Sequence, residues 1–410
     1  MPCAQARVLH RAVAGGPRRP WADDAGRMTH VLKAATPQDF LTLVPEIAGY
    51  HPRRSLVLVA FRGNRSCGVL RFDLPPAGDP QEPFATTAVG VLCKLRGADA
   101  VVPIVYTDDR FGWQSEMPRS DLLSDVVERA TRAGFEVRSA LVLAADGWGS
   151  LFDSRHPRGG RPRAEIRFLP RSEVTGRRLG AVDDMATLPT VDLAVTERVA
   201  WMLAKVQVQV QVQGQIGARR LPEAEPEREW EEDAMSFLES VLESVLESVS
   251  DRARAAEPAE ARSAAVDNEC AAALIWMMRI PSVRDSALLV WAFGEDPWGS
   301  AAGDGPGLLV GGRMTDQAAA ALLWGEGPRP DVDRVEAAIL LLGYLGASAP
   351  RSARVPILTM LAWLHWALGR SSVAGKFVEL ALAIAPDYSL AEIIGGMLAA
   401  GRLPEWAFDG

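Results

Sequence analysis

The sequence predicts an α/β N-terminal domain with a mixed sheet, followed by an all-α C-terminal helical domain. In the first half, continuous apolar runs of strand length alternate with amphipathic helical segments. From residue 267 onward only helical periodicity remains. We expect a disordered leader over residues 1–30, the α/β domain over 31–200, an acidic low-complexity linker or insert over 201–266 and the helical domain over 267–410.

The α/β domain begins with an expected hairpin. Residues 55–61, SLVLVAF, have the length and composition of a buried strand, and a polar segment with two glycines separates them from a second strand at residues 69–74. A helix over residues 84–96 follows. The next apolar run, residues 100–106, contains Pro103, which indicates an irregularity or an edge position.

A βαβ unit is the clearest pattern in this half. The strand at residues 100–106 precedes a helical stripe from Leu122 to Ala130, with Ser120 as its expected N-cap and Gly134 just past its end. A strand at residues 137–143 follows. This order implies parallel pairing of the two strands.

The helical domain should consist of short antiparallel hairpins, because its connections are short. A glycine-rich connector at residues 299–312 interrupts it. Ala374, Ala381 and Pro386 place a weak tetratricopeptide-like hairpin at the C-terminus. His365 lies among tryptophans and is expected in the core or at its rim. The expected helices span residues 270–278, 286–293, 316–324, 333–345, 355–368, 372–385 and 390–400.

The insert between the domains has a distinct composition. Residues 221–262 hold 13 acidic and 4 basic residues, and two perfect repeats occur nearby, four Val-Gln pairs at 206–213 and three Leu-Glu-Ser-Val copies at 238–249. The second repeat could form an amphipathic helix, either a docking helix for a partner or a solvated linker helix.

Composition excludes several classes of function. The net charge of −8 makes nucleic acid an unlikely partner, and no apolar run reaches the length of a membrane span. The four cysteines, Cys3, Cys67, Cys93 and Cys270, have no metal or redox spacing, which fits a reducing cytoplasm. Met28 is an alternative start. No cofactor or oligomeric state is indicated.

Four aspartates are the candidate ligand or metal site: Asp73, Asp108, Asp109 and Asp146. Each lies at or just past the carboxyl end of an expected strand. If these strands are parallel neighbours, the carboxylates meet at one edge and could hold a hard cation such as magnesium. The alternative is that aspartate is simply common where strands turn into loops.

Two loops are further candidates for a binding site. Residues 107–119 form a long loop with Phe111 and Trp113, which could close over a ligand or form a local core. Residues 153–180 carry eight arginines and three acidic residues, and could meet an anion or an acidic partner. The arginines that crowd its Pro/Gly-rich part are Arg155, Arg158, Arg161 and Arg163.

Several segments follow one another in a distinctive order: TPQDF at 36–40, GYHP at 49–52, RFDLP at 71–75, YTDD at 106–109, VRDSA at 283–287 and APDYSLA at 385–391. In this order they resemble an actinobacterial family catalogued only as a domain of unknown function, number 4192. The resemblance covers most of residues 32–404 apart from the acidic insert, and one departure is that no cysteine follows the Trp-Gly-Ser-Leu segment at residues 148–151. It implies no activity.

For function the sequence favours a cytoplasmic, non-enzymatic interaction or regulatory protein with the helical domain as its binding platform. The expected helical hairpins and the lack of a catalytic motif support this choice. The alternative is a ligand- or metal-binding enzyme with its site at the carboxylate edge of the sheet. The βαβ unit and the long 107–119 loop support that alternative.

Overall fold

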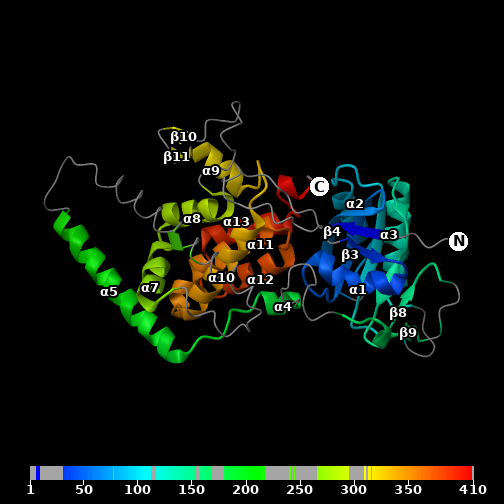
Figure 1. The fold of residues 1–410 in the computed structure, drawn as a ribbon, viewed down its shortest axis with the longest axis horizontal. Coiled ribbons are helices and arrows are strands. Elements are labelled where there is room, and N and C mark those ends of the chain that lie inside the picture. Colours follow the sequence, from blue (N-terminus) through cyan, green and yellow to red (C-terminus); the bar gives the residue numbers. More distant parts are fainter. Residues whose placement is uncertain are drawn as a thin grey trace. The chain divides into compact units, whose positions relative to one another are not determined.

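The computed structural model describes residues 6–9, 31–76, 78–111, 117–153, 157, 159–168, 180–217, 240–241, 244, 266–294, 309–310, 313–314 and 316–408. The chain forms two compact units. The first comprises Met1–Met185 and the last four residues, and is called the α/β unit here. The second, Ala186–Trp406, is called the helical unit. Figure 1 shows the fold of each unit.

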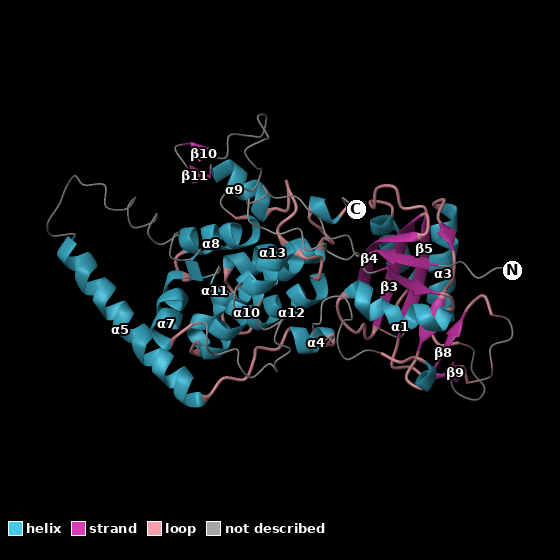
Figure 2. Ribbon diagram, in the orientation of Figure 1, coloured by secondary structure: helices cyan, strands magenta, loops and turns pink. Residues whose placement is uncertain are grey.

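The α/β unit is built on one mixed sheet of nine strands, in the order β2-β1-β4-β3-β5-β7-β8-β9, with β6 beside β5 (Figure 2). β4, β5 and β7 run in one direction, and β3 runs against them between β4 and β5. The strands are β1 (Ala6–Leu9), β2 (Val31–Ala34), β3 (Ser55–Arg62), β4 (Arg65–Asp73), β5 (Ala100–Tyr106), β6 (Glu136–Val137), β7 (Leu141–Leu143), β8 (Gly147–Ser150) and β9 (Arg161–Pro162).

The predicted hairpin and βαβ unit are both confirmed. β3 and β4 pair antiparallel across a two-residue turn, and Gly63 in that turn has a positive φ of 55°. β5 pairs in parallel with β6 and β7, with helix α3 (Ser120–Arg132) between them in sequence. The parallel ladder is interrupted opposite Pro103, which has no N–H to donate. Pro103 therefore marks an irregularity inside the sheet, and the single strand expected at 137–143 is split in two.

Strand β1 differs from the expected disordered leader. Residues 6–9 pair antiparallel with β2, and Arg7 pairs with Arg65 at the start of β4. A four-residue strand is too short to give a clear alternation in sequence, and the charges and prolines around it mask it. The rest of residues 1–30 lies outside the described part of the chain.

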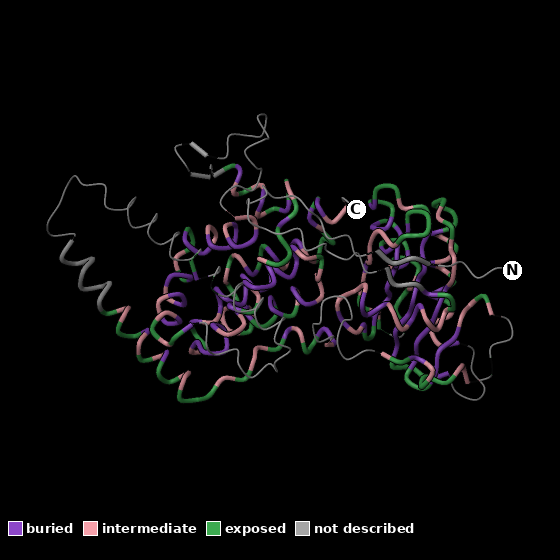
Figure 3. The backbone as a smooth tube through the Cα atoms, viewed as in Figure 1, coloured by how far each residue is buried: buried purple, intermediate pink, exposed green. Residues whose placement is uncertain are grey.

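Helices cover both faces of the sheet. Phe40, Leu41 and Val44 of α1 (Pro37–Ala48) share a core with alternate residues of β3 and β5, including Val57 and Ile104. The intervening strand residues face the other side, where α2 (Gln81–Leu92) and α3 pack together. The central strands β3 and β5 are buried along nearly their whole length (Figure 3), as expected for strands covered on both faces.

The helix starts explain part of the family-like sequence. Thr36 and Asp39 form a capping box at the start of α1, and Gly49 ends this helix with a φ of 78°. The predicted N-cap Ser120 is wrong, because the N-cap of α3 is Arg119, with φ 59° and no side-chain cap bond. Ser120 is instead the first residue of α3. The positive φ expected just past the end of α3 is found at Gly134.

The helical unit contains the predicted helices with small shifts at their ends. A short antiparallel pair is formed by β10 (Leu309–Val310), at the end of the expected connector, and β11 (Arg313–Met314), just after it, so the unit is mostly rather than purely helical. The helices are α5 (Leu193–Gly217), α7 (Asn268–Met277), α8 (Pro281–Phe293), α9 (Asp316–Leu323), α10 (Val332–Ser348), α11 (Arg354–Ala367), α12 (Ser371–Leu382) and α13 (Ser389–Ala399).

Helix α5 extends through residues expected to be linker. Its inner side, with Val199 and Leu203 buried, packs on α7, and the Val-Gln repeat continues the same helix. The helical unit accordingly starts at Ala186, before the expected boundary at residue 200. Of the Leu-Glu-Ser-Val repeat, Ser240, Val241 and Ser244 are described and are helical, and the rest lies outside the described residues.

Buried polar contacts hold the core of the helical unit. Arg284 in α8 donates to Asp285 at 2.8 Å and to the hydroxyl of Tyr388 at 2.5 Å, which joins two family-like segments 104 residues apart. Arg370 pairs with Glu336 of α10 at 2.5 Å. His365 is 2% exposed and stacks on Phe377, as the sequence predicted for a packed residue.

No helix in the described part of the chain has both the length and the hydrophobicity of a membrane span.

Candidate functional site

The four candidate aspartates lie along one edge of the sheet, which we call the carboxyl rim. Asp73 ends β4, residues 107–109 follow β5, and Asp146 follows β7. Because β3 runs the opposite way between β4 and β5, its start lies at this same edge. Arg53 and Arg54, which precede β3, therefore stand between the aspartates. The carboxyl rim carries both signs of charge.

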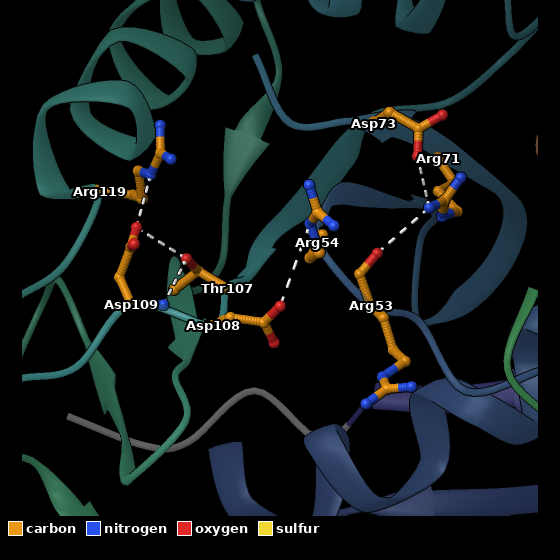
Figure 4. Close-up of polar contacts among 8 residues, drawn as sticks. All are labelled: Arg53, Arg54, Arg71, Asp73, Thr107, Asp108, Asp109 and Arg119. Carbon is orange, nitrogen blue, oxygen red and sulfur yellow. Dashed lines mark hydrogen bonds and ion pairs between the residues drawn. The ribbon is translucent and has the colours of Figure 1, made fainter. Parts of the chain in front are cut away.

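Asp109 is held firmly in place. Its carboxylate accepts hydrogen bonds from Arg119 and from the Thr107 hydroxyl, both at 2.8 Å (Figure 4). The guanidinium of Arg119 lowers the pKa of Asp109, and the Thr107 hydroxyl lowers it further. Arg119 is mostly buried and also donates to the carbonyl of Pro75 at 3.4 Å. This pair braces the loop after β5 against the chain that leaves β4.

Asp73 and Asp146 also have partners within the α/β unit. Arg71, whose side chain is buried, donates to Asp73 at 2.6 Å and to the carbonyl of Arg53 at 3.2 Å. Asp146 accepts a hydrogen bond from the backbone N–H of Phe111 at 3.1 Å. These two carboxylates position neighbouring segments of the carboxyl rim.

Asp108 and Arg54 form a much looser pair. Arg54 Nε lies 4.0 Å from Asp108 Oδ2, and the two side chains are 79% and 74% exposed. An exposed pair of this kind contributes about 0–1 kcal/mol to stability. Figure 4 shows it between the Arg119–Asp109 pair and the Arg71–Asp73 pair. Arg54 and Asp108 are therefore highly accessible and contribute little to the stability of the fold.

The backbone is strained at two arginines of this edge. Arg54 has φ 45° and Arg119 has φ 59°, and within the described residues these are the non-glycine positions with positive φ. The left-handed conformation costs roughly 1–2 kcal/mol per non-glycine residue. At Arg54 it is fixed by the backbone bond from Leu74 N–H to the Arg54 carbonyl at 3.0 Å. Strain of this kind concentrates at ligand sites.

Two buried hydroxyl groups lie just inside the carboxyl rim. Ser55 and Tyr106 pair directly across β3 and β5, so their side chains share the α1 face of the sheet. Both are buried, and neither hydroxyl has a hydrogen-bond partner among the described residues. Burial, and secondarily the neighbouring Tyr50, raise the pKa of Tyr106 far above its usual range. The Tyr106 hydroxyl therefore stays protonated and can donate.

Phe111 packs as a local core beneath the loop that carries the carboxyl rim. Its ring is 1% exposed and fills a slot left by Gly147, Gly149 and Gly160. A Cβ atom at Gly160 would lie 2.9 Å from the ring. Of the two readings for this residue, the structure supports the local core. Trp113 lies outside the described residues.

The candidate arginines of the 153–180 loop are engaged where they are described. Arg161 pairs with Asp153 at 2.8 Å and lies 5.5 Å from the centre of the Trp148 ring. Arg163 donates to the carbonyl of Ala144 at 2.7 Å. Arg155 and Arg158 lie outside the described residues. The described pair holds β8 and β9 in place, and its role toward an anion stays a prediction.

A second candidate surface is the outward side of α5, which we call the α5 outer face. Leu193, Trp201 and Val208 are exposed there at helical spacing. Arg198 and Lys205 lie over the Trp201 ring, at 4.7 Å and 3.8 Å from its centre. This face combines apolar area with positive charge.

An open depression of about 620 Å³ lies between the start of α1 and residues 164–167. Its polar groups are used within the unit, because Gln38 donates to the carbonyl of Glu165, and the Glu165 carboxylate accepts from Trp148. We regard it as a packing seam. Within the described residues no three His, Cys, Asp or Glu side chains are grouped closely enough to hold a metal ion.

Sequence reasoning missed Arg53 and Arg54 as rim residues. Arginine makes up 40 of the 44 basic residues, so a pair of arginines draws no notice by composition. The signal that could have identified them is their position directly before β3. This strand lies antiparallel between β4 and β5, both of which lead into aspartates.

No curated protein and no solved structure matches the chain. Residues 37–301, more than half of the chain, match the family model described as Domain of unknown function (DUF4192). This span includes every rim residue and the α5 outer face. The chain therefore belongs to the DUF4192 family.

Proposed function

We propose that the α/β unit binds a small charged ligand at the carboxyl rim. The observation that carries this proposal is the exposed Arg54–Asp108 pair, at 4.0 Å, on a strained backbone between two braced ion pairs. Open α/β sheets bind ligands outside the carboxyl ends of their strands, and β4, β5 and β7 end here. A braced frame around two exchangeable charges is pre-organised for binding.

A ligand panel tests this proposal on the full chain. Thermal shift with nucleotides, sugar phosphates, di- and tricarboxylates and divalent metal ions should yield at least one stabilising compound. Its affinity should then change several-fold or more in Arg54→Gln or Asp108→Asn, because each removes a charge at the contact. Glu128→Gln removes an equal charge from an exposed surface of α3 and should leave affinity unchanged. An affinity that neither rim variant alters would refute the proposal.

The interaction role that the sequence favours is a second candidate function, supported by the α5 outer face. We propose that this face receives an acidic amphipathic helix of a partner protein. Its exposed apolar residues fit an apolar stripe, and Arg198 and Lys205 fit carboxylates beside that stripe. An exposed tryptophan between cations is a suitable anchor for such a contact.

Fluorescence anisotropy tests the second candidate with a defined probe. A labelled peptide with the sequence LESVLESVLESV should bind the full chain, and Trp201→Glu should weaken binding roughly tenfold or more. Trp324→Glu is the matched control, because Trp324 is also exposed in the helical unit with an arginine, Arg402, over its ring. Equal binding by the two variants would contradict this role.

A further inference from the structure

The charges of the carboxyl rim point to the class of its ligand. This step rests on the proposed function, that the rim is a binding site. Figure 4 shows arginines standing among the aspartates, so the carboxylates of the carboxyl rim do not form an uncompensated acidic cluster. Asp73 and Asp109 already face a guanidinium at 2.6 Å and 2.8 Å. A metal ion at these carboxylates would have to displace or face those arginines, which opposes cation binding.

Arg54 offers what the carboxylates do not. Its backbone is anchored on both sides, since the Arg53 carbonyl accepts from Arg71 and the Arg54 carbonyl accepts from Leu74. The guanidinium itself reaches into solvent, with Asp108 as its weak neighbour. A guanidinium binds phosphate and carboxylate groups through paired hydrogen bonds that are stronger than neutral ones. An anchored backbone together with an exposed guanidinium is well suited to binding an oxyanion.

Two buried hydroxyls, at the start of β3 and at the end of β5, are a further observation at this edge of the sheet. Ser55 directly follows Arg54, and Tyr106 pairs with it across the ladder. Their hydroxyl groups have no partner among the described residues, although buried polar groups are nearly always paired. Both can donate to an oxygen acceptor or to a water molecule that bridges to one.

We propose that Arg54 binds an oxyanion, a phosphate or carboxylate group of a small ligand, in place of Asp108. Asp108 is then a built-in competitor, which occupies the guanidinium when the ligand is absent. The two rim variants accordingly act in opposite directions. Arg54→Gln removes the binding group, whereas Asp108→Asn removes its competitor.

Isothermal titration of the full chain tests this at constant ionic strength. The probes are inorganic phosphate, diphosphate and citrate in one arm, and magnesium and manganese chloride in the other. We expect diphosphate or citrate to bind, Arg54→Gln to weaken binding roughly tenfold or more, and Asp108→Asn to tighten it several-fold. Comparison of diphosphate with citrate tells phosphate from carboxylate ligands. Arg65→Gln, at the opposite end of β4, should bind as the unaltered chain does.

The outcomes separate this inference from the proposed function. Binding of a metal ion that Asp108→Asn weakens would overturn the oxyanion assignment and keep the carboxyl rim as a site. Equal anion binding in Arg54→Gln and Arg65→Gln would show unspecific attraction and refute the inference. Binding of no probe by a chain that circular dichroism shows to be folded would also refute it.

Discussion

The carboxyl rim and the interior of the helical unit use the same residue types in opposite ways. At the carboxyl rim, Arg54 and Asp108 are exposed, 4.0 Å apart and on a strained backbone. In the helical unit, Arg284 is buried and bonded to both Asp285 and Tyr388. When one partner of a buried ion pair is removed, the other charge is left without water or a counter-charge, which costs stability. When an exposed pair is broken, the remaining charge is hydrated, and little stability is lost. Burial therefore separates arginines that hold the fold from the arginine available to a ligand.

The largest effect should come from the buried arginine. Arg284→Met keeps the apolar stem, but leaves Asp285 and the Tyr388 hydroxyl without their partner. We expect a loss of about 3 to 4 kcal/mol in the free energy of unfolding of the helical unit. Urea denaturation followed by tryptophan fluorescence measures this loss. Lys376→Met breaks the exposed Lys376–Glu379 pair and should cost less than about 0.5 kcal/mol. A similar cost for both would remove the contrast between buried and exposed charges.

The next effect concerns the support beneath the carboxyl rim. Gly160→Ala places a Cβ atom against Phe111 at a φ of 76°, and we expect a loss of about 3 kcal/mol. Gly159→Ala is the matched control, because Gly159 has a φ of 88° but nothing within 4 Å of its added Cβ. It should cost about 1 kcal/mol, for the backbone alone. Chemical denaturation of both variants measures the difference, and equal costs would show that the slot is not tightly packed.

A third effect is the pH dependence of stability that His365 gives to the helical unit. Burial lowers the pKa of His365 to about 3 in the folded protein, and the positive charge of Arg370 contributes to this shift. In the unfolded chain the pKa of the same side chain is about 6.5. Below pH 6.5 the unfolded state binds a proton that the folded state excludes, so stability is lost as pH falls. We expect the free energy of unfolding to be about 2 kcal/mol lower at pH 5 than at pH 7 because of His365.

Urea denaturation of His365→Phe at both pH values checks this expectation. Phenylalanine can stack on Phe377 but carries no titrating group, so the variant should lose less stability between pH 7 and pH 5 than the unaltered chain. An identical loss in both proteins would show that His365 is not the group responsible.

The smallest effect compares the two strained arginines directly. Arg54→Gly and Arg119→Gly relieve the same backbone conformation, so the difference between them reports on the side chains. Arg54→Gly should be neutral or stabilising by up to about 1 kcal/mol, because relief of the left-handed backbone offsets the entropy of glycine and the loss of an exposed ion pair. Arg119→Gly loses the bonds to Asp109 and Pro75 and should be about 1 kcal/mol less stable than Arg54→Gly. Thermal denaturation measures both, and the reverse order would place Arg54 among the structural residues.

Local sequence patterns predicted most helices and strands. The features they did not predict depend on contacts between residues far apart in the sequence. Apolar periodicity placed α10 and α11 within a few residues, and strand-length runs placed β3 and β5. It could not show that β3 runs between β4 and β5, which puts Arg54 among the aspartates. The left-handed backbone of Arg119 displaced the expected cap at Ser120, because contacts to Asp109 and Pro75 fix that residue. The bond from Arg284 to Tyr388 spans 104 residues, beyond any local pattern.

The slot around Phe111 ties together positions that are distant in sequence. The Phe111 ring occupies the space that side chains at Gly147, Gly149 and Gly160 would need. A larger side chain at one of these glycines therefore requires a smaller one at position 111. A relative with alanine at the equivalent of Gly149, which has no positive φ, should carry a smaller residue at the equivalent of Phe111. Paired replacements of this kind would identify the loop after β5 and the glycines around it as a unit that is inherited together.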